Sequence, residues 1–471
     1  MPPEEFERAS REVFEWMGEY LADPSTHAVL SEVEPGEVLA ALPPEPPESG
    51  EEFSQILRDF RDLVLPGITH WNHPGFFAYF SISGSVPGVL AEALVATLNV
   101  NAMLWRTSPA ATELEERVSD WTRQLLGLPP EFRGHIQDTA STSTLVSLAT
   151  AREATGLGVR DAGLSGRDVP ALRLYCSEEA HSSVEKAAIT IGIGRSSVNR
   201  IATDSNFRMR PSRLIDAIEA DLAQGARPFC IVATVGTTST TSVDPIAEVA
   251  AIARQYDLWL HIDAAYGGAA AAIPEMRHLM AGWEQADSIV VNPHKWLFVP
   301  IDCSLLLLRD PAATRSAFSL VPEYLETPES DRVTNLMDYG PALGRRFRAL
   351  KLWMTLRYFG TSGIAERLRK HIALARDLAD SVEAEESWVL AAPVPFSTVC
   401  LRYDPGHLTG EQLDRANEQI LERVNASGEV FLSHTRLRER YTLRVAIGNI
   451  RTEKRHVQRA WELLREAAEV V

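Results

Sequence analysis

The stretch that decides the fold is Ser288-Ile-Val-Val-Asn-Pro-His-Lys-Trp296. Its apolar beginning predicts a buried strand, after which Asn292, His294 and Lys295 interrupt the apolar pattern before it resumes at Trp296. A lysine between two apolar runs is unusual because burying an ammonium group is costly. The segment alone fits a surface turn with a solvent-exposed lysine as well as it fits a recessed, functional lysine.

Around this segment, strand-like apolar runs alternate with helical patterns from about residue 86 onward. Such alternation is typical of a mainly parallel sheet covered on both faces, whose ligands bind beyond the carboxyl ends of the strands. The predicted strands are Leu172–Cys176, Phe229–Thr234, Leu258–Ile262, Ser288–Val291 and Cys303–Leu308. The predicted helices are Pro109–Leu126, Thr142–Gly156, His181–Ile191, Pro211–Gln224 and Pro245–Tyr256, the last with Asp244 as its N-cap.

The two ends of the chain differ from this central region. Apolar residues at helical spacing in Glu5–Leu21 predict an amphipathic helix that needs a surface to lie on, and the Pro- and Glu-rich run 43–52 predicts a linker. After residue 346, long helical patterns mix with alternating strands. We therefore predict an N-terminal helical segment (1–85), a large α/β domain (86–345) and a smaller C-terminal α+β domain (346–471).

Composition and charge disfavour several classes of protein. The 471 residues carry 46 basic and 64 acidic side chains, a net charge of −18, which disfavours nucleic acids and anionic membranes as partners. No signal peptide is recognisable, and polar residues interrupt the apolar stretch Val86–Trp105, which favours a buried helix over a membrane span. Four widely spaced cysteines fit reduced core thiols and neither a metal site nor a disulfide framework. We expect a cytoplasmic protein.

Three other segments place polar residues where predicted strands meet helices. Asp263 ends an apolar strand and fits either a buried partner for a cation or a helix cap. Gln137–Thr144 puts hydroxyl groups at a helix start, where they fit a phosphate site or simple capping. His181 lies at another strand-to-helix junction, where a lone histidine is more often structural. Each signal is weak alone, but together they supply the phosphate site, carboxylate, imidazole and amine that pyridoxal phosphate requires.

Longer motifs strengthen this interpretation, because the chain resembles the group II pyridoxal-phosphate-dependent amino-acid decarboxylases, in particular the aromatic-L-amino-acid decarboxylases. The resemblance extends over nearly the whole chain. Its motifs occur in order, as His70-Trp-Asn-His-Pro74, Ser108-Pro-Ala-Ala-Thr-Glu-Leu-Glu115, Ala180-His-Ser-Ser-Val-Glu185, Val232-Ala-Thr-Val-Gly-Thr-Thr238, His261-Ile-Asp-Ala-Ala-Tyr266, Asn292-Pro-His-Lys-Trp296 and Leu343-Gly-Arg-Arg-Phe347. The resemblance implies the pyridoxal-phosphate-dependent transferase fold (fold type I) and a homodimer with shared active sites.

The resemblance also implies roles for individual residues. Lys295 is the lysine that bonds to the cofactor, Asp263 pairs with its pyridine nitrogen, and His181 stacks on its ring opposite Ala265. The other cofactor contacts that it implies are Ala140, Ser141, Thr238, Asn292 and His294. Tyr324 matches the loop tyrosine that protonates the substrate carbon in this family, and relatives that make aldehydes carry Phe there. The family usually has Gly-Ser where this chain has Asp138-Thr139, so some phosphate contacts are expected to differ.

By the same resemblance, a set of mostly apolar side chains receives the substrate, with the 100–103 loop coming from the partner subunit. The set is Trp71, Tyr79, Phe80, Ile82, Asn101, Met103 and Gly344. None of these residues is basic, which disfavours glutamate as a substrate. Gly344 leaves room for a large ring, and Ile82 stands where the DOPA enzyme presents a hydroxyl to its substrate, so the pocket favours tryptophan or phenylalanine over DOPA.

The expected reaction is therefore α-decarboxylation of tryptophan, phenylalanine, tyrosine or DOPA to the arylalkylamine. Three alternatives are open. Gly344 disfavours histidine decarboxylation, because relatives that prefer histidine often have Ser there. Tyr324 disfavours oxidative conversion to an aldehyde. The intact set of Lys295, Asp263, His181 and Tyr324 disfavours a cofactor-binding protein without turnover.

Overall fold

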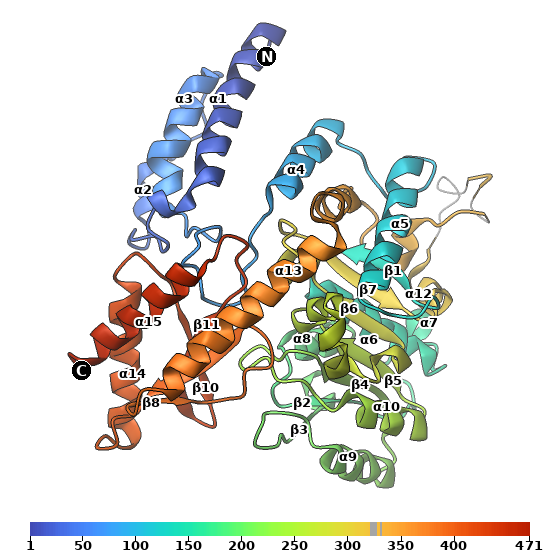
Figure 1. Cartoon of the computed structure of the whole chain (residues 1–471). Coiled ribbons are helices and arrows are strands. Elements are labelled where there is room, and N and C mark those ends of the chain that lie inside the picture. The colour runs from blue at the N-terminus through green and yellow to red at the C-terminus, as the bar shows by residue number, and fades with distance from the viewer. Residues whose placement is uncertain (321–326, 330–331) are drawn as a thin grey trace.

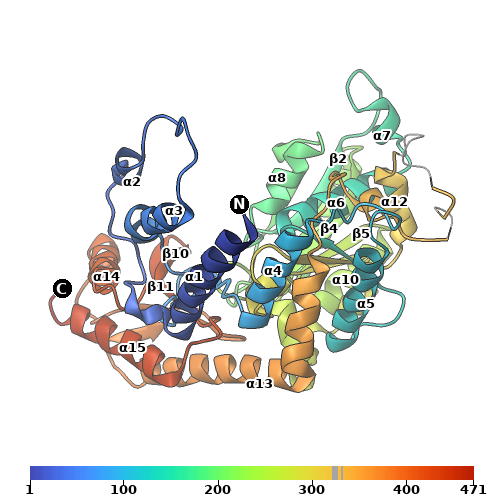
Figure 2. The same ribbon diagram turned by 90° about the horizontal axis from the view of Figure 1, so that it is seen from above.

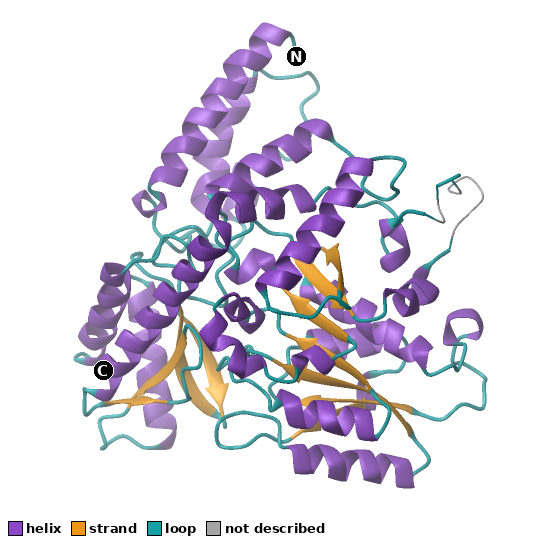
Figure 3. Cartoon of the chain, turned by 45° about the vertical axis from the view of Figure 1, so that its right-hand side comes forward, coloured by secondary structure: helices purple, strands orange, loops and turns teal. Residues whose placement is uncertain are grey.

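The protein is built around two sheets of different kinds. The computed structural model describes residues 1–320, 327–329 and 332–471. A seven-stranded sheet with helices on both faces forms the large body, and a four-stranded sheet with its own helices lies beside it (Figure 1). The N-terminal helices α1 (Pro3–Ala22) and α3 (Phe53–Asp59) extend together away from both sheets (Figures 1 and 3).

The large sheet confirms the mainly parallel architecture. Its strand order is β1-β7-β6-β5-β4-β2-β3, in which β2 to β6 run parallel and β7 is antiparallel to both β6 and β1. The strands are β1 (Arg133–Gln137), β2 (Leu172–Ser177), β3 (Val198–Ile201), β4 (Arg227–Thr234), β5 (Trp259–Asp263), β6 (Ser288–Val291) and β7 (Ser304–Leu308). The sequence patterns did not reveal the edge strands β1 and β3, because both are short and carry polar or charged residues.

The register of the central strands aligns their carboxyl ends. Thr234 pairs with Asp263 across β4 and β5, and Asp263 pairs with Val290 across β5 and β6. Because parallel strands end at the same edge of a sheet, the residues that follow β4, β5 and β6 meet in one place. This edge is where a ligand is expected to bind.

Helices cover both faces of the large sheet (Figure 3). They are α5 (Pro109–Leu125), α6 (Ala140–Ala154), α7 (Val159–Ala162), α8 (Ser183–Thr190), α9 (Pro211–Ala223), α10 (Ile246–Gln255), α11 (Pro293–Trp296) and α12 (Pro311–Phe318). The prediction of Asp244 as the N-cap of α10 is wrong. Its buried carboxylate instead accepts hydrogen bonds from the amides of Met209 (2.7 Å) and Thr234 (2.8 Å), and so ties a loop to the end of β4.

The smaller sheet is antiparallel, with strand order β10-β11-β9-β8. It consists of β8 (Trp388–Leu390), β9 (Thr398–Tyr403), β10 (Ser433–Leu437) and β11 (Arg440–Ala446), accompanied by α13 (Ala349–Glu383), α14 (Gly410–Asn425) and α15 (Lys454–Ala468). Element α13 consists of two helical stretches that meet at a kink at Gly360, whose φ of 65° is non-helical. We propose that the chain divides into its three parts at residues 85 and 345. Helix α13 then contributes side chains to the hydrophobic core of the large domain and to that of the small domain.

Helix α4 (Val86–Leu98) is buried on one face only, so the expectation of a buried helix is wrong for the single chain. Ala91 and Val95 are buried. A second face of the helix carries exposed apolar side chains at intervals of four residues: Val86, Leu90, Leu94 and Leu98, at 43–59% exposure. Phe6 and Phe14 on α1 are exposed in the same way (Figure 2 shows α1 and α4 from above). Within the described ranges, no helix is long and apolar enough to cross a membrane.

The four cysteines are unpaired and buried, as expected from their spacing. They are Cys176, Cys230, Cys303 and Cys400. Burial raises the pKa of each thiol, to about 12 for Cys303 and about 11 for Cys400. These cysteines are therefore protonated, unreactive parts of the core.

Candidate active site

A cavity of about 550 Å³ lies at the carboxyl edge of the large sheet and extends to the small domain. Its volume is within the range of small-molecule sites. Most of the residues predicted from the sequence line it: Trp71, Tyr79, Phe80, Ile82, Ala140, Ser141, His181, Thr238, Asp263, Ala265, Asn292, His294 and Lys295. Segments far apart in the sequence thus converge on one site, as the strand register requires.

Lys295 lies in the short helix α11, directly after β6, and is only partly buried. Its Nζ lies 5.2 Å from the centroid of the Phe80 ring and has no hydrogen-bond partner among the described residues. Burial lowers the pKa of Lys295, while the negative charge of Asp263 opposes this shift. Asp263 ends β5 and is itself buried, with its Oδ1 accepting a hydrogen bond from the Ala265 amide (3.1 Å). The cavity thus contains an amine that loses its proton readily and a fixed carboxylate.

Two histidines in the cavity have their tautomers set by the backbone. The Ser183 amide donates to Nδ1 of His181 (3.1 Å), and the Cys303 amide donates to Nδ1 of His294 (2.9 Å). Each neutral ring therefore carries its proton on Nε2. Loss of water around the rings lowers the pKa of both, to about 3 for His294, and in His181 the nearby Asp263 opposes the shift. Both histidines are neutral hydrogen-bond donors near pH 7.

The amino end of α6 forms another wall of the cavity. The N-cap residue Thr139 makes no side-chain bond to the first turn, which leaves the amides of that turn, at Ala140 and Ser141, open to an anion. Two buried oxygens of the lining, Thr234 Oγ1 and Asn292 Oδ1, have no hydrogen-bond partner in the described part of the chain. An amine, a carboxylate, an anion-binding helix end and unpaired polar atoms fit pyridoxal phosphate.

A stack of three aromatic rings runs from Phe80 and Tyr266, which line the cavity next to Lys295, to Trp296. The Phe80 and Tyr266 rings lie 3.9 Å apart at 17°, and the Tyr266 and Trp296 rings lie 4.8 Å apart at 7°. The Trp296 indole N–H donates to Nδ1 of His371 on α13 (3.0 Å). Helix α13 thereby holds the residue next to Lys295 in place.

Sequence reasoning missed Arg444, which lines the cavity from β11. Its Nε donates to the Ser239 carbonyl (3.0 Å), Nη1 donates to the Tyr79 carbonyl, and its Cζ lies 4.7 Å from the Phe80 ring centroid. The buried Nη2 has no hydrogen-bond partner within the described ranges. An arginine within the apolar alternation of residues 441–446 was the signal that could have revealed it. The expectation that no basic residue belongs to the pocket is therefore wrong.

Three of the predicted residues that the structure describes do not line this cavity within one chain. Asn101, Met103 and Gly344 lie together elsewhere: Asn101 Nδ2 is 3.4 Å from Met103 Sδ, and a Cβ added to Gly344 would lie 3.9 Å from the same nitrogen. Gly344 therefore accompanies the 100–103 loop. Tyr324 lies outside the described residues.

Comparisons with known proteins agree with this geometry. The family described as "Pyridoxal-dependent decarboxylase conserved domain" matches residues 35–404. Tyrosine decarboxylase 4 of Petroselinum crispum is 39% identical over 100% of this chain and 94% of its own length, and phenylacetaldehyde synthase of Arabidopsis thaliana is 39% identical over 99% and 96%. The crystal structure of Oryza sativa TDC with PLP and tryptamine superposes with a TM-score of 0.95 at 34% identity, covering 100% of this chain and 99% of the other.

The support of Trp296 by His371 predicts a pH-dependent stability. Burial lowers the pKa of His371 from 6.5 to about 3, so the unfolded chain binds a proton more readily, and stability is lost as pH falls below 6.5. The loss due to this group is about 1.4 kcal/mol per pH unit. In His371→Gln, which keeps an acceptor, urea midpoints at pH 7, 6 and 5 should fall less steeply than in the wild type. If the urea midpoints of the variant and the wild type fell equally steeply with pH, His371 would not be a source of the pH dependence.

Proposed function

This chain belongs to the pyridoxal-dependent decarboxylases, and on that basis we propose that it removes the α-carboxyl group of aromatic L-amino acids to give arylalkylamines and carbon dioxide. The observation that carries this proposal is the position of Lys295, beside Asp263 and against Phe80, in a cavity with an aromatic wall. Trp71 and Tyr79 extend that wall, with ring centroids 5.8 Å apart. Flat apolar surfaces of this kind suit an aromatic side chain.

The residues that hold the cofactor are proposed from the same lining. Lys295 would bond to it, Asp263 would pair with its ring nitrogen, and His181 and Ala265 would flank the ring. The phosphate would lie against Ala140, Ser141, His294, Asn292 and Thr238. Pyridoxal phosphate supplies an aldehyde that bonds to amines and a ring that accepts the electron pair left when carbon dioxide departs.

The chain's own groups manage the protons of this reaction. The lowered pKa of Lys295 favours the uncharged amine, the form that attacks a carbonyl carbon. The Asp263 carboxylate would keep a proton on the pyridine nitrogen, because the two groups form an ion pair only when that nitrogen is protonated. Tyr324 would deliver the proton that replaces the carboxyl group at the substrate Cα, since a phenol is a suitable general acid.

Arg444 is proposed to orient the substrate. Its buried, unpaired Nη2 suits a carboxylate oxygen, and every α-amino acid brings one α-carboxylate. A single guanidinium therefore accounts for the α-carboxylate and leaves the aromatic wall for the side chain. The basic residue that sequence reasoning missed thus supports an aromatic rather than an acidic substrate.

The proposed assembly is a homodimer with shared active sites. The exposed apolar stripe of α4 and the exposed phenylalanines of α1 would be covered by a second copy. The cluster of Asn101, Met103 and Gly344 would then complete the partner's cavity, which explains its distance from Lys295 within one chain. The acidic surface and the buried, unpaired thiols support a cytoplasmic location.

A product assay on the cofactor-loaded enzyme tests the proposed function. Tryptophan, phenylalanine, tyrosine, DOPA, histidine and glutamate would be supplied separately, and amine, aldehyde and hydrogen peroxide measured for each. Arylalkylamines from the aromatic set alone are expected. Histamine, aldehyde with peroxide, or no carbon dioxide from any amino acid would overturn the proposal in favour of one of the alternatives.

Replacing the amine tests the role of Lys295. Lys295→Ala should reduce the decarboxylation rate below detection and remove the absorbance of the lysine-bound cofactor. Lys454→Ala, an exposed lysine paired only with Asp377, is the matched control and should behave as the wild type. Full activity of Lys295→Ala would remove this residue from the mechanism.

Replacing the phenol tests Tyr324. Tyr324→Phe should shift the product from amine towards aldehyde, because the Cα would lose its proton donor and become open to oxidation by dissolved dioxygen, which is reduced to hydrogen peroxide while water replaces the amino group and ammonia is released. Amine, aldehyde and peroxide are measured from the same reaction. Unchanged amine output would show that another group protonates the carbon.

Removing the guanidinium tests Arg444. Arg444→Gln should lower kcat/KM by about 10- to 100-fold, the worth of a charged hydrogen bond to a carboxylate. An amine without a carboxylate should bind equally well to both proteins, which separates substrate recognition from a general loss of structure. Arg436→Gln on the neighbouring strand β10 is the control. If the variant bound the amino acid and the amine equally less tightly, Arg444 would act only by shaping the pocket wall.

A further inference from the structure

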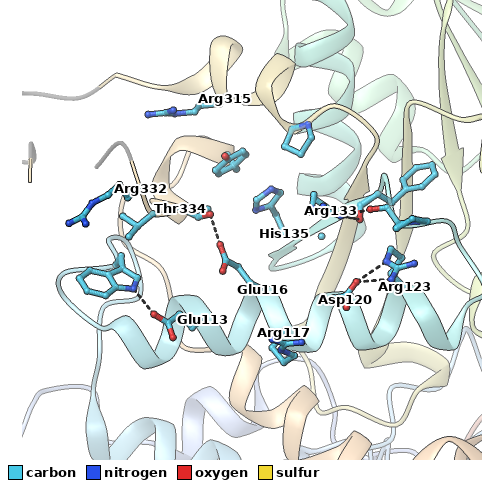
Figure 4. Close-up of a pocket in the computed structure, with 17 residues that line it drawn as sticks. Glu113, Glu116, Arg117, Asp120, Arg123, Arg133, His135, Arg315, Arg332 and Thr334 are labelled. Carbon is cyan, nitrogen blue, oxygen red and sulfur yellow. Dashed lines mark hydrogen bonds and ion pairs between the residues drawn. The ribbon is translucent and has the colours of Figure 1, made fainter. Parts of the chain in front are cut away.

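A second, larger cavity of about 1020 Å³ lies beside α5 and the edge strand β1 (Figure 4). Residues 332–334 and the end of the short helix η9 (Leu336–Tyr339) complete its wall. It shares no lining residue with the cavity that contains Lys295. The proposed decarboxylation gives it no role.

The lining of this cavity is positively charged although the whole protein is strongly acidic. It carries five arginines against three carboxylates, a local charge of 5 − 3 = +2, in a chain of net charge −18. The arginines are Arg117, Arg123, Arg133, Arg315 and Arg332. A cavity with this excess of positive charge favours an anion.

The three carboxylates are already bound by neighbouring groups. Glu113 accepts a hydrogen bond from the Trp105 indole (2.8 Å), Glu116 accepts one from the Thr334 hydroxyl, and Asp120 pairs with Arg123 (2.8 Å) (Figure 4). Carboxylates held in this way are not arranged to surround a cation.

The arginines are less fully paired than the carboxylates. In the described part of the chain, the side chains of Arg117 and Arg332 have no hydrogen bond or ion pair, and Arg133 bonds only to two backbone carbonyls. Arg315 pairs with Asp338 at 3.4 Å and is half exposed. Guanidinium groups therefore remain available for oxyanions.

His135 is the residue that points to a ligand. Its side chain, on β1, is only 5% exposed, yet neither ring nitrogen has a hydrogen-bond partner among the residues that the structure describes. The ring stacks on Tyr339 (centroids 3.9 Å apart at 14°) and lies among the charged side chains of the cavity (Figure 4). Burial lowers the pKa of His135 to about 3, so the ring is neutral and offers one N–H donor and one acceptor. Buried polar groups are normally paired, and the cavity is the place from which a partner can come.

We propose that this cavity binds a small, multiply charged oxyanion, a phosphate ester or a polycarboxylate, with Arg117 and Arg332 neutralising its charge and the His135 N–H donating to one of its oxygens. The site is independent of the proposed decarboxylation. The protein would thus have a second ligand, which is highly charged where the side chain of the proposed substrate is apolar.

Calorimetric titration of the cofactor-loaded enzyme tests this site. Inorganic pyrophosphate and citrate are the probes, with chloride at matched ionic strength as the reference, and bound cofactor keeps its own phosphate site filled. One binding event per chain is expected with at least one probe. Preference for pyrophosphate would identify a phosphate ester, and preference for citrate a polycarboxylate. Heats equal to the chloride reference for both probes would overturn the proposal.

Variants of the lining locate the binding. Arg117→Gln and Arg332→Gln should each weaken binding by about tenfold, as expected for the loss of a charged hydrogen bond. Arg213→Gln, an exposed arginine that pairs only with Asp216, is the matched control and should bind as the wild type. Equal affinity in all three variants would show that binding occurs elsewhere and would overturn the proposal.

His135→Phe separates recognition from packing. Phenylalanine keeps a flat ring against Tyr339 but removes both nitrogens, so the thermal midpoint should not fall while binding weakens by about fivefold or more. Unchanged affinity would mean that only water pairs with His135 and would overturn its part in the site. If this variant does not fold, the arginine variants decide.

Discussion

The parallel register of β4, β5 and β6 is the constraint on which the rest of the structure depends. It places Thr234 and Asp263 side by side and brings Asn292 to the same edge, one residue past the end of β6. A shift of one residue in β5 would turn the Asp263 side chain to the opposite face of the sheet, and the same shift in β4 would turn Thr234 away. The strands are mostly apolar and almost entirely buried, so their register is set by the core and not by the polar groups at its edge.

This edge becomes a site because the small domain completes it. Helix α13 supplies His371, which holds Trp296, and the stack of Trp296, Tyr266 and Phe80 transmits that support to the surroundings of Lys295. Strand β11 supplies Arg444, which donates a hydrogen bond to the carbonyl of Tyr79, a residue with a φ of 50°. The large domain alone would therefore contain the amine and the carboxylate without Arg444 and without the support that His371 gives to Trp296.

Sequence reasoning succeeded where a pattern is local and failed where packing decides. Apolar runs identified the central strands, and the motif around Lys295 identified the chemistry, because both depend on adjacent residues. The short, polar strands β1 and β3 carry no such pattern. Tertiary structure alone brings the Asp244 carboxylate to the amides of Met209 and Thr234. It likewise places the Arg444 guanidinium over the Phe80 ring. The position of Gly344 beside the 100–103 loop likewise becomes visible only when the chain is folded.

The burial of all four cysteines has a practical consequence for chemical labelling. Their thiols are held in the protonated form and shielded by the core, so a maleimide in solution meets no competing natural thiolate. A cysteine introduced at an exposed polar position of α1 or α4, away from the apolar side chains proposed to meet the second copy, would be modified selectively without removing any native cysteine. Paired spin labels or fluorophores could thus measure distances between those helices in the assembled protein.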